Sequence, residues 1–194
     1  IYDMYRGDYG ATVNAAVVQT QEGGTDMFAT STRMYVLSSA NNVYKCMNNY
    51  SGATSTVEPS GTSTSEFTTS PDNYVWKYMY TLSTTQITNF MTTDFVAVAT
   101  DSTVASAAVP GAVGQYIVAN GGAGYTYGTV NLGSSYTFSD TALSSASSMG
   151  SGSGGVVSVV ISPKEGHGND AVNELGGHYV MMRTTLTGAE ADDV

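Results

Sequence analysis

The chain has 194 residues, enough for one domain with a hydrophobic core and a smaller attached lobe. Only 11% of the residues are charged, and the formal net charge at pH 7 is −10. Its six scattered Lys and Arg residues are too few for the basic surface that nucleic acid or an anionic membrane would require. No apolar run reaches the length of a transmembrane helix, so membrane insertion is not expected.

Abundant Thr, Val and Tyr with few charged residues predict a mainly β fold with one or two short helices. We expect an antiparallel, β-sandwich-like domain formed by residues 1–109 and 162–194, with a small β lobe inserted at residues 110–161. The single cysteine, Cys46, excludes an internal disulfide and a cysteine-based zinc cluster. It lies in a strand pattern, where a small buried hydrophobic residue is the ordinary interpretation.

The first ten residues are rich in tyrosine and acidic groups and contain Arg6-Gly7-Asp8, a tripeptide known from cell adhesion. Arg and Asp on either side of a glycine also make an ordinary turn, and a three-residue match is common by chance. The turn is therefore the favoured interpretation. Residues 11–19 are expected to form a short strand.

Residues 33–37 and 43–47 predict a β-hairpin, with Asn in the connection to tolerate a left-handed backbone. A long polar loop follows at residues 48–73. Loops of this length are uncommon inside a compact domain unless they are functional or contact a partner. The candidate interface residues in this loop are Tyr50, Val57, Glu58, Phe67 and Asp72.

Large apolar side chains occupy every even position of residues 74–82, which is typical of a strand that packs one face on a core. The candidate core residues are Tyr74, Trp76, Tyr78, Tyr80 and Leu82. A capping box of Ser83 and Gln86 then predicts a helix of about two turns. Residues 95–99 return to strand, and the Ala-rich residues 101–109 predict another helical piece.

The lobe begins with a predicted strand at residues 115–119, a glycine-rich hairpin turn at 120–124 and a second strand at 128–132. The turn lacks the Gly-Lys-Ser/Thr ending and the following helix of a phosphate-binding loop. Residues 139–155 are Ser/Gly-rich and flexible by composition. Residues 156–161 predict a buried strand. A short helix at 170–175 and a last strand at 179–186 complete the chain.

Few residues suggest chemistry. His167 and His178, with Asp170 and Glu174 nearby, have the residue types of a metal site or an acid–base pair. Their spacing differs from helical zinc motifs, so a turn histidine bonded to the backbone is favoured. Neither a Gly-x-Ser-x-Gly elbow nor a Cys–His signature is present. No catalytic residue, cofactor or metal ligand is therefore assigned.

Several blocks of sequence, in their order along the chain, resemble one family: the dimer-forming baseplate wedge subunits of T4-like contractile phage tails, in the form carried by cyanophages. They cover nearly the whole chain, and together they are more specific than any one alone. The blocks are residues 1–6, 43–46, 72–82, 93–95, 120–126 and 162–168, followed by 174–176.

The resemblance implies a structural, non-enzymatic, β-rich protein of the virion tail baseplate, assembled in the host cytoplasm. Its implied partners are other wedge subunits and a second copy of itself, as a homodimer. The family's chain extends beyond both ends of this sequence, which implies a fragment of a longer protein. We expect residues 48–73 and 139–155 to be ordered mainly by neighbouring subunits, because both lack apolar anchors.

Two other functions remain open from the residues. A carbohydrate-binding or adhesion module of a tail fibre or surface protein would need Tyr74, Trp76 and Tyr78 exposed in a groove. A hydrolase would act through His167 or His178. Burial of Trp76 would exclude the first function in this form.

Overall fold

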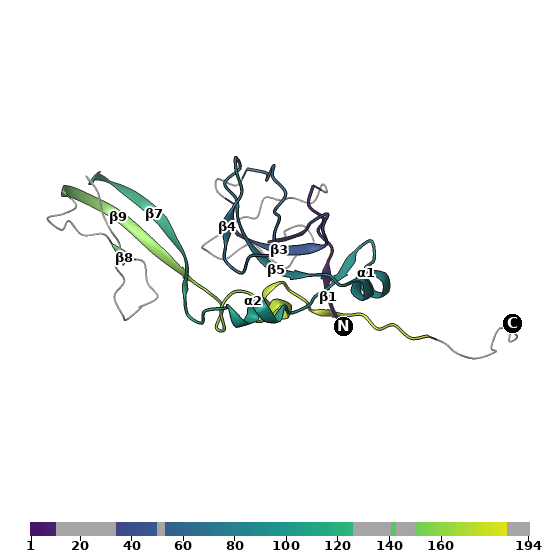
Figure 1. Cartoon of the computed structure of the whole chain (residues 1–194). Coiled ribbons are helices and arrows are strands. Elements are labelled where there is room, and N and C mark those ends of the chain that lie inside the picture. Colours follow the sequence, from purple (N-terminus) through teal and green to yellow (C-terminus); the bar gives the residue numbers. More distant parts are fainter. Residues whose placement is uncertain (11–33, 50–52, 126–140, 143–149, 186–194) are drawn as a thin grey trace, which may run out of the picture. The chain divides into compact units, whose positions relative to one another are not determined.

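A computed structural model describes residues 1–10, 34–49, 53–125, 141–142 and 150–185 (Figure 1). The described residues form antiparallel sheets with a few short helices, which confirms the predicted β-rich fold with a small helical content. The chain divides into two compact units, residues 1–108 with 167–194 and residues 109–166. Each unit is described by itself.

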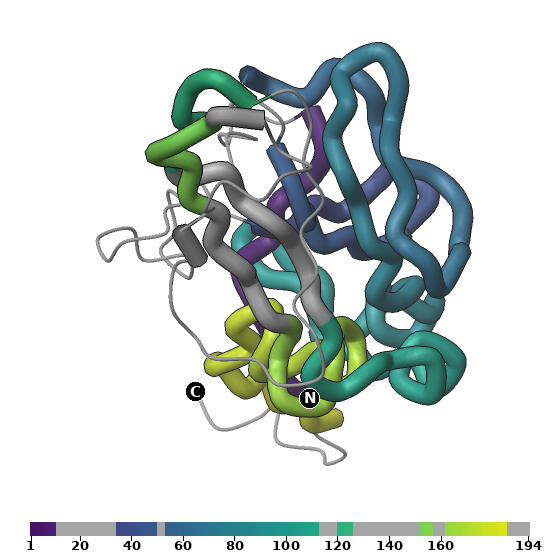
Figure 2. The backbone as a smooth tube through the Cα atoms, turned by 90° about the vertical axis from the view of Figure 1, so that its left-hand side faces the viewer, coloured from purple at the N-terminus to yellow at the C-terminus, as the bar shows by residue number. Residues whose placement is uncertain are grey.

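The first sheet of unit 1 joins distant parts of the chain in the order β10-β1-β6. Its central strand β1 (Tyr2–Tyr5) pairs antiparallel with β6 (Phe95–Ala97) and with β10 (Tyr179–Val180). Figure 2 shows the yellow C-terminal part of this unit gathered around the N-terminus. The sequence did not predict β1. The last strand was expected at residues 179–186, and β10 contains only the first two of them.

The second sheet of unit 1 has the order β2-β3-β5-β4. Strands β2 (Tyr35–Leu37) and β3 (Asn42–Asn48) form the predicted hairpin, and Asn41 in its connection has a φ of 61°. Strand β5 (Val75–Thr81) pairs with β3 on one side. The two-residue β4 (Phe67–Thr68), inside the predicted loop, pairs on the other side.

Both sheets contribute to one hydrophobic core. Met4 and Val96 from the first sheet and Val43 and Trp76 from the second belong to the same buried cluster. After β1 the chain crosses to the second sheet, where the amide of Leu37 donates to the carbonyl of Gly7 (2.7 Å). A strand that changes sheets makes a corner, which closes the two sheets around their shared core.

Strand β5 is buried on both faces, so the prediction of one core face is wrong. A β-bulge lies where Val43 is paired with Tyr80 and Tyr44 with Tyr78, leaving Met79 as the extra residue. Val43 and Tyr44 are consecutive in β3, so their side chains point to opposite faces of the sheet. Each shares its face with the residue it is paired with, so Tyr80 and Tyr78 also lie on opposite faces. Lys77 and Met79, at odd positions, are also buried.

The described residues contain three short helices, each capped by a side chain that the sequence supplies. The predicted capping box of α1 (Thr84–Phe90) is confirmed, with Ser83 Oγ and the side chain of Gln86 exchanging hydrogen bonds with the backbone. Asp101 caps α2 (Ser102–Ser106), and Asp170 caps α3 (Ala171–Glu174). Acceptors at these positions satisfy amides that have no partner within the helix.

Unit 2 is built on the antiparallel pair of β7 (Val113–Tyr125) and β9 (Gly150–Ile161), with the short β8 (Thr141–Ala142) beside β9. The predicted glycine-rich turn at residues 120–124 is wrong, because these residues continue β7 and pair with β9. The expected flexibility is likewise wrong for residues 150–155, which are strand. The predicted strands at residues 11–19 and 128–132 lie outside the described residues.

The side chain of Tyr125 explains how glycine-rich strands hold together. A Cβ atom at Gly122 or Gly152 would collide with the Tyr125 ring, and the Tyr125 hydroxyl accepts a hydrogen bond from the amide of Gly155 (3.0 Å). The ring therefore occupies the space that side chains at these positions would fill. Covering strand glycines with an aromatic ring restores packing that glycine cannot provide.

Candidate functional site

The candidate interface loop is held together by the Asp72 carboxylate. Its Oδ2 accepts hydrogen bonds from Ser55 Oγ (2.7 Å) and from the amides of Thr56 (2.9 Å) and Val57 (3.0 Å). Its Oδ1 accepts one from Thr69 Oγ1 (2.6 Å). Asp72 thus fastens the start of the described loop to its end, a structural role that the sequence did not reveal.

The pKa of Asp72 reflects these bonds. Burial alone would raise it, but the hydrogen bonds from Thr69, Ser55 and the two backbone amides outweigh burial and lower it to about 2. The carboxylate is therefore charged throughout the neutral range. A carboxylate that accepts several hydrogen bonds is stabilised in its ionised form.

The other candidate interface residues that the structure describes also contact groups of the same chain. Glu58 accepts a hydrogen bond from the amide of Ser39 (2.6 Å), and the Phe67 ring lies edge-on to Tyr44, with ring centroids 5.9 Å apart. Val57 is half-buried. Tyr50 lies outside the described residues.

Further contacts fix the loop to the second sheet. The Tyr44 hydroxyl donates to the carbonyl of Gly61 (2.6 Å), Lys77 Nζ donates to that of Thr64 (2.8 Å), and Pro59 is fully buried. The expectation that this loop lacks apolar anchors is wrong for residues 53–73, because Pro59 is fully buried and Phe67 packs against the core. Most of the second segment, residues 139–155, lies outside the described residues.

All five candidate core side chains are buried: Tyr74, Trp76, Tyr78, Tyr80 and Leu82. Trp76 has no exposed surface, and the Tyr74 ring stacks on it at a centroid distance of 5.5 Å. Stacking on a sugar needs an exposed ring face. This strand therefore cannot provide the exposed aromatic platform on which the carbohydrate-binding alternative depended.

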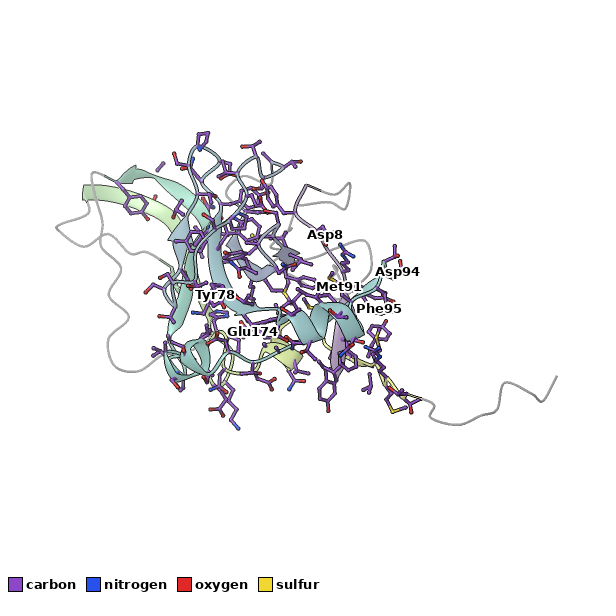
Figure 3. All side chains as sticks on the ribbon, turned by 45° about the vertical axis from the view of Figure 1, so that its right-hand side comes forward. Asp8, Tyr78, Met91, Asp94, Phe95 and Glu174 are labelled. Carbon is purple, nitrogen blue, oxygen red and sulfur yellow. The ribbon has the colours of Figure 1, made fainter. Side chains whose placement is uncertain are left out.

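The Arg6-Gly7-Asp8 tripeptide is closed on itself. Arg6 Nε and Nη2 donate to the Asp8 carboxylate at 2.7 to 3.1 Å, and Gly7 is buried against the second sheet. Asp8, labelled in Figure 3, follows the corner between the two sheets. The two charges of the tripeptide therefore pair with each other.

A second polar cluster is built on Glu174, whose side chain is only 4% exposed (Figure 3). Its Oε1 lies 2.7 Å from both Lys45 Nζ and His167 Nδ1, and its Oε2 accepts from the amide of Gly168 (2.7 Å). Of the four residues considered for a metal site or an acid–base pair, only His167 and Glu174 are in contact. His178 is exposed, and Asp170 accepts from the amide of Asn173.

The favoured interpretation of His167, a histidine bonded to backbone, is wrong, because its partner is the Glu174 carboxylate. The Glu174 carboxylate only accepts hydrogen bonds, so this bond uses the tautomer of His167 with a proton on Nδ1; Lys45 Nζ lies 3.2 Å from the same nitrogen. Burial would raise the pKa of Glu174, but hydrogen bonds from His167, Lys45 and the amide of Gly168, together with the charge of Lys45, lower it to about 2. The cluster fastens β3 to the segment around α3, which is a structural use of these charges.

One more lysine lies beside this cluster. Lys77 is directly opposite Lys45 across β3 and β5, and it is buried. Burial lowers the pKa of Lys77, since a charged ammonium is poorly solvated inside the protein. The described residues contain no group of three or more His, Cys, Asp or Glu side chains arranged to hold a metal ion.

Exposed apolar side chains gather at one place in unit 1. Five of the six large hydrophobic residues that are exposed in the described part of the chain lie along β1, β10 and the residues that flank them. We call this the ribbon patch: Ile1, Tyr2, Tyr179, Val180 and Met182. Sequence reasoning missed it, because the two strands are far apart in the chain and each is too short to show a pattern.

Tyr2 and Val180 are paired directly, so they share one face of the ribbon. Tyr2 is 53% exposed, Val180 64% and Met182 89%. Tyr179 points to the opposite face of the ribbon, where its ring packs with those of Tyr5 and Phe95 at centroid distances of 5.1 to 5.2 Å. Concentrated apolar exposure of this kind marks a contact surface more often than isolated exposed residues do.

Comparison of the chain with protein-family models, with curated proteins and with solved structures finds no match. Among the described residues, no helix is both long and apolar enough to cross a membrane. The functional inference therefore depends on the geometry above and on the sequence blocks.

Proposed function

We propose that this chain is a structural subunit that works through protein–protein contacts, and that its specific role is in the wedge of a contractile phage-tail baseplate, as a homodimer beside other wedge subunits. The ribbon patch is the observation that supports the general role. The ordered sequence blocks support the specific one. In this role the chain needs no catalytic group, cofactor or metal.

The distribution of polar and apolar groups also favours an assembly protein. The Asp72, Glu174 and Arg6 side chains are bonded to groups of the same chain, in contacts that hold segments together. Large apolar side chains remain outside, on the ribbon patch. Burying such surface is the main favourable contribution to association between proteins.

The proposal is tested by wedge assembly with a double variant, Val180→Thr and Met182→Gln. Full burial of one such side chain contributes about 1.5–3 kcal/mol, so losing two weakens association by at least about a hundredfold. The matched control is Val109→Thr, because Val109 is a 60% exposed valine of unit 2. Incorporation into wedges reconstituted from the neighbouring wedge proteins is measured by sedimentation. Equal incorporation of the double variant and the control contradicts the proposal.

A further inference from the structure

The outer edge of β10 has backbone groups that no other described residue pairs with. The amide of Met181 donates to the carbonyl of Ile1 (3.0 Å), so Met181 is hydrogen-bonded to the β1 side. In an antiparallel pair, alternate residues direct their amide and carbonyl groups to opposite sides. Val180 and Met182 therefore direct theirs away from β1, and neither has a hydrogen-bonding partner on that side among the described residues.

The pairing of β1 with β6 supports this assignment independently. The amide of Val98 donates to the carbonyl of Tyr2 (2.8 Å), which places Tyr2 among the residues that bond β6. Tyr2 is paired with Val180 without bonding it, because its own groups face the other neighbour. Val180 is thus in a non-hydrogen-bonded pair, and its backbone is open at the edge of the sheet.

The side chains at this edge are exposed and apolar. Met182 follows Val180 by two residues, the spacing that returns a side chain to the same face of an extended chain. Figure 1 shows the yellow segment after β10 leading away past the N-terminus. Between residues 175 and 185 the sequence contains no acidic residue, in a chain of net charge −10, and Arg183 is exposed there.

We infer that the outer edge of β10 accepts an extended strand from a partner polypeptide, which adds a fourth strand to the β10-β1-β6 sheet. This inference rests on the proposed protein–protein role and specifies how one contact is made. Unpaired amide and carbonyl groups at a sheet edge are a template for another extended backbone, and the exposed side chains favour apolar residues at alternate positions of that strand. The cationic Arg183 favours an acidic residue at the end of that strand.

The experiment measures amide hydrogen exchange of the full 194-residue chain by NMR, with and without a blocked ten-residue peptide of alternating Val and Thr ending in Glu. Alone, the Val180 and Met182 amides should exchange freely, while the Met181 amide is protected by its bond to Ile1. At a peptide concentration about ten times Kd, about one tenth of the edges remain free, so both amides slow about tenfold.

The matched variants are Val180→Pro and Met181→Pro. Proline at position 180 removes an amide that faces outward, which an edge strand tolerates. It should abolish the peptide effect and leave the Met181 amide protected. Proline at position 181 removes the amide that bonds Ile1, and it should release β10 from β1. Retention of the peptide effect in Val180→Pro overturns the inference.

Three further results overturn it. The first is protection of the Val180 and Met182 amides in the dilute chain alone, and the second is no protection at peptide concentrations up to about 1 mM. The third is protection of these two amides that increases with protein concentration while size-exclusion chromatography shows twice the mass of one chain. That result would mean that a second copy of the chain occupies the edge. The wedge assay separates the two proposals. If Val180→Pro is incorporated into wedges and the double variant Val180→Thr, Met182→Gln is not, the apolar side chains make the contact and the open backbone does not. The protein–protein role then stands, and the addition of a strand is refuted.

Discussion

Replacing Glu174 with glutamine should destabilise the protein strongly at neutral pH and little at acidic pH. The carboxylate accepts from Lys45, His167 and the amide of Gly168 while nearly buried. Its pKa falls from 4.5 to about 2. At about 1.4 kcal/mol for each tenfold change in proton affinity, the charged form supplies ~3 kcal/mol of stability. Removing one partner of a buried pair costs a similar amount, about 3–5 kcal/mol.

The sign of the pH dependence follows from the lowered pKa. Because the folded state holds the carboxylate ionised more strongly than the unfolded state does, this stability is present above pH 4.5. It is lost as the pH falls from 4.5 towards 2, where Glu174 becomes protonated and resembles glutamine. The Glu174→Gln variant and the original chain should therefore approach equal stability near the acid end of that window.

Urea unfolding at pH 7 and pH 3 measures both effects, with Glu165→Gln as the control because Glu165 is exposed. The control should change stability by less than about 0.5 kcal/mol. Adding Lys45→Met to Glu174→Gln should recover part of the loss, because the lysine would otherwise remain without its carboxylate. A cost below about 0.5 kcal/mol at pH 7, or one independent of pH, refutes the reasoning.

Three other perturbations test the loop, the core and unit 2. Asp72→Asn should lower the free energy of unfolding by about 1 kcal/mol. It should also speed hydrogen exchange of the Val57 amide, because this amide donates to the Asp72 carboxylate; unchanged exchange would contradict the role of Asp72 in holding the loop. Trp76→Ala should cost about 3–5 kcal/mol in thermal unfolding, and native Trp76 emission should resist quenching by iodide because the ring is buried. Gly152→Ala should make unit 2 sensitive to protease, because the new Cβ collides with the Tyr125 ring. Adding Tyr125→Ala to Gly152→Ala should relieve that collision. If Gly152→Ala does not raise protease sensitivity, or if Tyr125→Ala does not lower it again, this packing is contradicted.

Signals that act within a few residues were predictable from the sequence. Ser83 and Gln86 lie three residues apart, and their reciprocal hydrogen bonds form from that spacing alone. The β2–β3 hairpin has its left-handed Asn41 in the connection, where the sequence placed it. In both cases the residues that determine the backbone are neighbours, so no knowledge of the rest of the fold was needed.

Irregular pairing was not predictable in the same way. The alternation along residues 74–82 suggested one buried face, but the bulge at Met79 turns Tyr80 to the face opposite Tyr78. Bulges depend on the partner strand, which a single segment does not specify. Similarly, glycines at residues 120–124 suggested a turn, because nothing in that segment shows that Tyr125 will cover them.

The polar clusters were hidden because their members are far apart in the chain. Lys45 and Glu174 are separated by 129 residues, and Ser55 and Asp72 by 17. Glu174 was noted beside the histidines for its chemistry, and its lysine partner gave no signal. Asp72 was expected to face a partner, because a carboxylate in a polar loop looks like a surface residue until its donors are known.

These clusters also indicate where contacts with other proteins should be sought. A carboxylate such as Asp72 or Glu174 already has its donors, so a partner would have to break those bonds to use it. At the outer edge of β10, by contrast, Val180 and Met182 offer unpaired backbone groups and exposed apolar side chains together. Association there replaces only water. By this comparison the ribbon patch offers a protein partner more unsatisfied surface than the described part of the polar loop does.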